Sequence, residues 1–110
     1  MTHAQLDERS LAFARAIANR LHGKPELVEI ARANLKRWMS SNVRSTSSAR
    51  NWREWLAIIE GGSMETVMHA LLREDDEGQR LRQSNPFVGV LSPEEVRRTK
   101  QEFAHAAPGA

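Results

Sequence analysis

The stretch RLRQSNPFVGVLSPEEVRR (residues 80–98) decides how the C-terminal half of this chain folds. Its centre is the apolar segment FVGVL (residues 87–91), which lies between two charged sequences that favour helix. Ser92, Pro93 and Glu95 form a helix start in which the serine caps the first turn, proline takes the first helical position and the glutamate reaches back. The segment FVGVL is therefore predicted to be a loop whose two ends are held by helices.

An apolar loop with fixed ends either covers the core of its own domain or stays outside as an anchor for a partner. The closeness of the two flanking helices favours the first arrangement. Phe87, Val90 and Leu91 are expected to point inward and Val88 outward, because Gly89 allows the chain to turn between them. A strand is not expected here, since prolines flank the segment and no partner strand exists.

Apolar residues at helical spacing predict the rest of the fold. Gly23 followed by Pro25, and later the pair Gly61-Gly62, separate the predicted helices. The fold class is all-α, a compact bundle of five to six short helices in a single domain over residues 1–104. The serine-rich stretch at 40–48 is expected to be a loop, and residues 105–110 a disordered tail. The first three helices are expected at about residues 5–22, 25–39 and 49–60. Ser63 is expected to cap a fourth helix with an apolar stripe from Met64 to Leu72, a fifth should run from Asp75 or Asp76 to about Gln83, and the last from Pro93 to Phe103 or Ala104.

Composition excludes several classes of protein. The 110 residues contain no cysteine, which rules out disulfide scaffolds, zinc ribbons and thiol catalysis. No apolar run approaches the length of about 18 residues typical of a membrane helix, and the N-terminus lacks the pattern of a signal peptide. We therefore expect a cytoplasmic protein that does not contact the membrane.

The net charge of +2 conceals two regions of opposite sign. Residues 24–53 carry seven basic and two acidic side chains, a net charge of +5, whereas residues 54–79 carry one basic and seven acidic side chains, a net charge of −6. The basic region could face a polyanion and the acidic region a basic partner, or both could be ordinary solvated surfaces.

The sequence contains no residue spacing that is typical of a catalytic or metal-binding motif. The four histidines have no metal-ligand spacing, and the acidic run at residues 74–77 lacks the alternation and central glycine of a calcium loop. No glycine-rich phosphate loop is present. We therefore predict no catalytic residue, no metal and no cofactor, and a protein that is not an enzyme.

Three tryptophans near arginines are the main candidates for a binding surface. Such tryptophans either fill the core at helix ends or reach the surface as interface anchors. The residues proposed for partner binding are Trp52, Trp55, Arg50, Arg53 and Val88. The residues proposed for nucleic-acid contact are Arg32, Lys36, Arg37, Arg44, Arg50 and Arg53.

Standard major-groove reading by a helix-turn-helix is disfavoured. The second predicted helix carries Glu26 and Glu29 in its N-terminal turns, where a recognition helix usually contacts bases. Contact with phosphates through the basic region remains an open alternative.

The chain resembles a group of small bacterial proteins that look like antitoxin-type partners encoded beside toxin-like genes. The most specific stretch is RLRQSNPFVGVLSPEE (80–95), and the others are LDERSLAFARAIANRL (6–21), ARANLKRW (31–38) and WREWLAII (52–59). The resemblance implies a helical, non-catalytic protein that binds and neutralises a cognate toxin-like protein. It assigns no functional residue.

The leading hypothesis is thus a non-enzymatic interaction module. The alternatives are a nucleic-acid-binding transcriptional regulator that uses residues 32–53, and a phage-encoded inhibitor of a host machine. The oligomeric state, including a homo-oligomer, is left open by the sequence.

Overall fold

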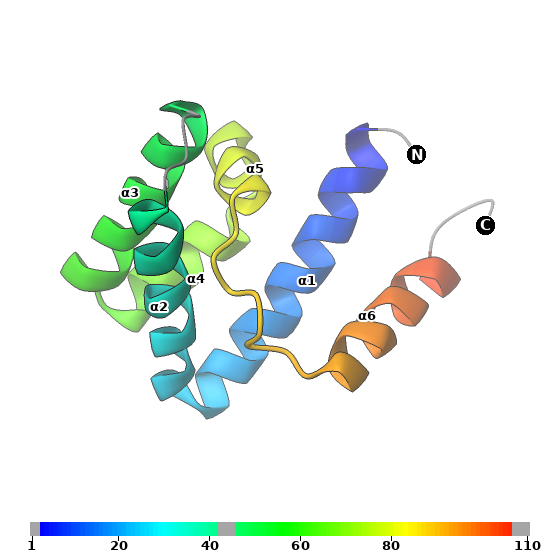
Figure 1. The fold of residues 1–110 in the computed structure, drawn as a ribbon. Helices are drawn as coiled ribbons and strands as arrows, with labels where there is room; N and C mark the ends of the chain where they lie inside the picture. Colours follow the sequence, from blue (N-terminus) through cyan, green and yellow to red (C-terminus); the bar gives the residue numbers. More distant parts are fainter. Residues whose placement is uncertain (1–2, 42–45, 107–110) are drawn as a thin grey trace.

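The computed structural model describes residues 3–41 and 46–106, and every regular element in these two ranges is a helix (Figure 1). The predicted all-α fold is confirmed. In chain order the elements are α1 (His3–Gly23), a short 3₁₀ helix η1 (Pro25–Leu27), α2 (Val28–Ser40), α3 (Thr46–Gly61), α4 (Met64–Leu72), α5 (Asp76–Gln83) and α6 (Pro93–Ala106).

Helix α1 is the central element of the bundle, because α4, α5 and α6 all pack against it. Helices α2 and α3 form an antiparallel pair, and α3 also contacts α4. Helix α6 lies along α1 on the side away from α2 and α3 (Figure 1). The long α1 therefore connects two parts of the surface that are remote from each other.

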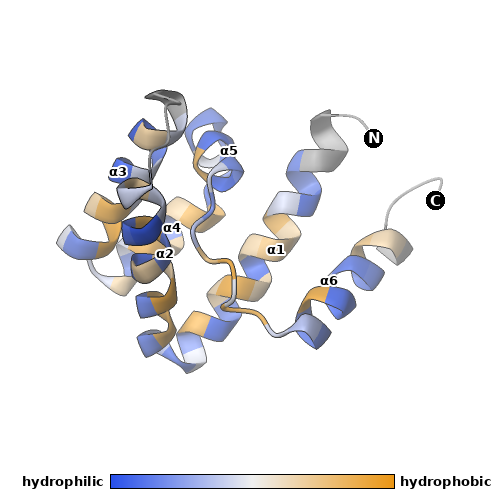
Figure 2. Cartoon of the chain, viewed as in Figure 1, coloured by the Kyte–Doolittle hydropathy of each residue, from blue (hydrophilic) through white to orange (hydrophobic). Residues whose placement is uncertain are grey.

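The core forms where the apolar stripes of these helices meet, as their spacing predicts (Figure 2). Burial of such side chains is the main favourable contribution to folding, at about 25 cal/mol per Å² of apolar surface. The buried cluster includes Ala14, Ile17, Leu21, Ala31, Leu35, Trp55, Ile59, Val67, Ala70, Leu71, Leu81, Phe87, Val90 and Leu91.

The apolar loop after α5 covers this core, as predicted. Phe87 retains 2% of its surface, and Val90 and Leu91 are also buried, whereas Val88 is 66% exposed. The Phe87 ring meets the Trp55 ring edge-on, with centroids 5.4 Å apart and an interplanar angle of 80°. This T-shaped arrangement is favourable for aromatic pairs beyond the area that they bury.

Side-chain hydrogen bonds from Asn34 and a tight turn at Gly89 determine the path of the loop. The buried side chain of Asn34 on α2 donates from Nδ2 to the main-chain oxygens of Pro86 (2.9 Å) and Val88 (2.8 Å). Gly89 has a φ of +96°, and the Val90 N–H donates to the Phe87 carbonyl (3.1 Å), which closes a tight turn. A side chain at the glycine would be strained in that conformation.

The helix start expected at Ser92 is confirmed, and two further helices have side-chain caps. Glu95 N–H donates to Ser92 Oγ (3.1 Å) and Ser92 N–H donates to Glu95 Oε1 (3.0 Å), which is a reciprocal capping box at the start of α6. These hydrogen bonds from Ser92 lower the pKa of Glu95. Ser63 caps α4, and Asp75 caps α5 through the Gly78 N–H.

Two predicted helix boundaries were wrong. Helix α3 begins at Thr46 and not at Ala49, so the loop predicted at 40–48 is shorter; residues 42–45 lie outside the described residues. Ser and Thr are well tolerated at helix N-termini, where their oxygens can accept from free N–H groups. Helix α6 reaches Ala106, beyond the predicted end at 104, and residues 107–110 lie outside the described residues.

Candidate functional site

Trp38 and Trp52 form an aromatic pair between α2 and α3. Their ring centroids lie 5.6 Å apart at an interplanar angle of 42°, and both side chains are half-buried. Trp38 sits near the end of α2 and Trp52 near the start of α3, so the pair lies at the end of the helix pair where α2 finishes and α3 begins. Each ring therefore packs on the core with one part and faces solvent with the other.

Trp55, one of the residues proposed for partner binding, belongs to the core. Its side chain is fully buried, with 0% of its surface exposed, and its Nε1 donates to the Leu81 carbonyl (2.9 Å). Because the ring has no free surface, Trp55 is removed from the candidate interface. Its role is to join α3 to α5 and to the Phe87 loop.

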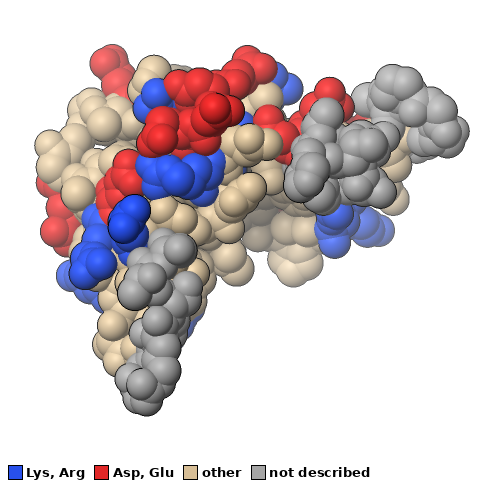
Figure 3. Space-filling view, turned by 90° about the horizontal axis from the view of Figure 1, so that it is seen from above, with Lys and Arg blue, Asp and Glu red and all other residues tan. Residues whose placement is uncertain are grey.

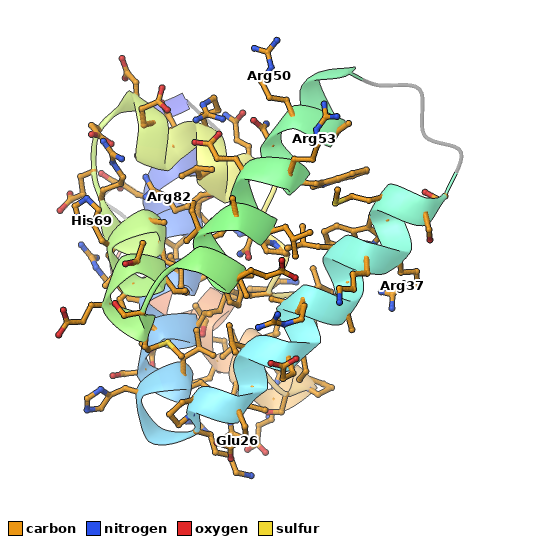
Figure 4. All side chains as sticks on the ribbon, turned by 90° about the vertical axis from the view of Figure 1, so that its left-hand side faces the viewer. Glu26, Arg37, Arg50, Arg53, His69 and Arg82 are labelled. Carbon is orange, nitrogen blue, oxygen red and sulfur yellow. The ribbon has the colours of Figure 1, made fainter. Side chains whose placement is uncertain are left out.

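Three exposed arginines lie on the two helices that carry the aromatic pair. Arg50 and Arg53 project from the first half of α3, and Arg37 projects from α2 (Figure 4). Lys36 is also exposed, and neither it nor Arg50 nor Arg53 forms an ion pair within residues 3–41 and 46–106. These cations are available to a partner.

Two other residues proposed for nucleic-acid contact do not join this group. Arg32 is half-buried and forms ion pairs with Glu29 (3.1 Å) and Glu60 (3.4 Å), so its charge is already engaged. Arg44 lies outside the described residues. Of the six residues proposed for nucleic-acid contact, Lys36, Arg37, Arg50 and Arg53 are therefore the ones that the structure shows as exposed.

A shallow hollow of about 300 Å³ adjoins the two tryptophans. Its far wall comes from the end of α5, where Asn51 Nδ2 donates to Ser84 Oγ (3.1 Å) and Arg80 Nη1 donates to Asn51 Oδ1 (2.6 Å). The hollow is therefore framed by ordered polar side chains beside an aromatic surface. The residues that line it are Trp38, Ser41, Ser48, Trp52, Gln83, Ser84 and Asn85.

Val88 adjoins this surface through α2. Asn34 Oδ1 accepts a hydrogen bond from Arg37 Nη2 (2.6 Å), while Asn34 Nδ2 holds the Val88 carbonyl. The side chain of Asn34 thus links the main chain at the exposed Val88 to Arg37. We define the Trp/Arg surface as Trp38, Trp52, Arg37, Arg50, Arg53 and Val88.

Four of the seven acidic residues in the region 54–79 form intramolecular ion pairs with arginines. Viewed from above, acidic side chains gather with basic ones directly beside them (Figure 3). Arg80 pairs with Glu54 and Glu77, and Arg73 pairs with Asp75.

The electrostatics of these pairs favour the ionised carboxylates. The Arg73 guanidinium and the Gly78 N–H lower the pKa of Asp75 to about 2, and Arg80 lowers the pKa of Glu77. The described residues contain no cluster of metal-ligating side chains. Within the run at residues 74–77, Asp75 caps α5, and Asp76 and Glu77 lie in its first turn, where the helix dipole favours negative charge.

Sequence reasoning missed two buried polar residues that shape this part of the molecule. Asn34 lies among the apolar positions of α2, three residues after Ala31 and one before Leu35, which is a detectable signal for a buried polar role. Arg82 follows Leu81 on α5, and nothing in its neighbours along the chain marks it as buried.

Comparison of the chain with protein-family models, curated proteins and solved structures gave no match. Within the described residues, no helix combines the length and the apolar character needed to cross a membrane. Functional inference for this protein therefore depends on its own geometry.

Proposed function

We propose that the protein is a non-enzymatic interaction module of the antitoxin type, which binds and neutralises a cognate protein through the Trp/Arg surface. The observation that carries the proposal is the half-buried Trp38–Trp52 pair beside a hollow, on two helices that also carry exposed arginines. Tryptophan and arginine are the residues most enriched among those that contribute most binding energy at protein interfaces.

The arrangement also indicates the chemistry of the partner. Because the two rings are already packed against each other and the core, little side-chain freedom is lost when a partner covers them. Arg37, Arg50 and Arg53 would favour an acidic rim on the partner around an apolar side chain that enters the hollow. The expected target is therefore a protein with an acidic patch around an exposed apolar residue.

Co-purification of the tagged protein from its native host tests the proposal. One protein should co-purify in stoichiometric amount with the wild type and be lost with Arg50→Glu/Arg53→Glu, because two attractive contacts become repulsive. The matched control is Arg97→Glu/Lys100→Glu, which reverses two exposed charges on α6, away from the Trp/Arg surface. Expression of the captured protein alone should slow growth, and co-expression with the wild type should restore it.

Equal capture by both double variants would contradict the Trp/Arg surface as the interface. A captured protein without an effect on growth would contradict the antitoxin function. A captured component of an essential host machine would instead support the phage-encoded inhibitor.

A second candidate function, nucleic-acid binding, is favoured by the exposed cations Lys36, Arg37, Arg50 and Arg53, none of which forms an ion pair with a residue that the structure describes. If these four side chains contact phosphates, the logarithm of the binding constant should fall with the logarithm of salt concentration with a slope of about −3 to −4. Arg50→Ala/Arg53→Ala should weaken binding to all sequences alike. Gel shifts across a salt series measure this, and no complex at low salt with about 100 µM protein would reject the regulator.

A further inference from the structure

A groove of about 600 Å³ lies between the middle of α1, over residues 8–19, and the second half of α6. This side of the molecule is opposite to α2 and α3, and therefore to the Trp/Arg surface (Figure 1).

Small residues on α1 leave the groove open. Ala12 and Ala16 are four residues apart and so lie on the same side of the helix. Because neither side chain extends beyond a methyl group, Phe103 of α6 remains half-exposed above them, next to the buried Leu11. Thr99 adds no free hydroxyl, since its Oγ1 donates to the Glu95 carbonyl within α6 (2.8 Å). The apolar part of the groove is thus formed by Leu11, Ala12, Ala16 and Phe103, with the polar Asn19 beside them.

The rim of the groove is acidic. Glu8, Glu74 and Glu102 are exposed, and none of them forms an ion pair with any residue that the structure describes. Arg15 contributes the positive charge on the rim. The net charge of −2 contrasts with the +2 of the whole chain.

We propose that this groove binds a basic amphipathic helix of a partner protein. An amphipathic helix docks in a groove through apolar residues spaced three and four apart, and here they would cover Phe103, Leu11 and the two alanines. Lysines or arginines beside that stripe would meet the three carboxylates of the rim. The site goes beyond the proposed function, because it lies on another part of the surface and attracts the opposite charge.

A second copy of the chain does not supply such a helix from α6. The exposed side of α6 carries Arg97, Arg98 and Lys100, whose positive charges are complementary to the acidic rim. The residues beside them, Gln101 and Ala104, provide no large apolar side chain that could fill the apolar part of the groove. Because that side of α6 has no apolar stripe, a helix of a different protein is the expected occupant.

A synthetic 18-residue helix with a leucine stripe flanked by lysines is the probe, and fluorescence anisotropy of the labelled peptide measures its binding. Glu8→Lys/Glu102→Lys should weaken binding by about tenfold or more, since two rim contacts become repulsive. The matched control Glu26→Lys/Glu65→Lys makes the same change of net charge at two exposed positions outside the groove, and should change the affinity by less than about twofold.

A second pair of measurements separates groove binding from general attraction. A peptide with its leucines changed to alanine should lose binding, and ¹⁵N shifts caused by the parent peptide should fall on α1 and α6. Equal loss in both double variants, retention by the alanine peptide, or shifts on α2 and α3 would overturn the proposal. Self-association that is abolished by Glu8→Lys/Glu102→Lys would also overturn it, in favour of a second copy. The Trp/Arg surface is unchanged in every variant, so these outcomes are independent of the co-purification result.

Discussion

Replacing Phe87 by alanine should lower the free energy of unfolding by about 3–5 kcal/mol, the range for truncation of a buried phenylalanine. The side chain is 2% exposed and lies against Trp55, so the mutation removes both apolar burial and an aromatic pair. A domain of this size has a total stability of about 5–15 kcal/mol. The loss is therefore a large fraction of the total stability, and the variant should melt at a markedly lower temperature than the wild type.

Thermal melts followed by circular dichroism measure this effect, with Val88→Ala as the matched control. Val88 is 66% exposed on the same loop, and its truncation should change stability by less than about 0.5 kcal/mol. A loss of 1 kcal/mol moves the Tm of a domain of this size by about 4–8 °C. A shift below about 2 °C for Phe87→Ala would show that the loop does not cover the core.

The position of this loop could be predicted because its signals are local. The capping residues around Ser92 and the glycine at position 89 determine backbone geometry within a few residues. The inward direction of Phe87 follows from those fixed ends. Asn34 could not be placed in the same way, because the two carbonyls that it holds lie 52 and 54 residues further along the chain.

The candidate site was predictable only in part for a related reason. Trp52 and Trp55 are three residues apart, so both lie on the apolar side of α3, and helical spacing alone cannot separate the core residue from the surface residue. The distinction is made by α5 and the Phe87 loop, which cover Trp55 and leave Trp52 half-exposed. Similarly, the ion pair of Arg32 with Glu29 is local within α2, but its second pair, with Glu60, depends on how α3 packs against α2.

Replacing Arg82 by alanine should be the second large effect, with a loss of about 3 kcal/mol of unfolding free energy. Its side chain is 1% exposed and lies inside the bundle (Figure 4). Nη1 donates to the carbonyls of Leu71 (3.1 Å) and Arg73 (2.6 Å), and Nη2 donates to Asp7 Oδ1 (2.9 Å). One guanidinium thus joins the end of α4 and the first half of α1 to α5.

Two further variants separate the contributions of this guanidinium. Arg82→Met keeps most of the buried volume but leaves both carbonyls without their donor, and should cost about 1–3 kcal/mol. Asp7→Asn keeps an acceptor oxygen for Nη2 and removes only the charge of a side chain that is 26% exposed. Because solvent already screens that carboxylate, Asp7→Asn should cost about 1 kcal/mol or less.

The expected order of destabilisation is therefore Arg82→Ala, then Arg82→Met, then Asp7→Asn, measured by urea unfolding at neutral pH. Both Arg82 variants remove the donor that the Leu71 and Arg73 carbonyls at the end of α4 depend on, whereas Asp7→Asn leaves that donor in place. If Asp7→Asn were as costly as Arg82→Ala, the ion pair and not the carbonyl bonds would hold the helices together. Hydrogen exchange provides a second readout: Arg82→Ala should speed exchange at the end of α4, whereas Asp7→Asn should leave it unchanged.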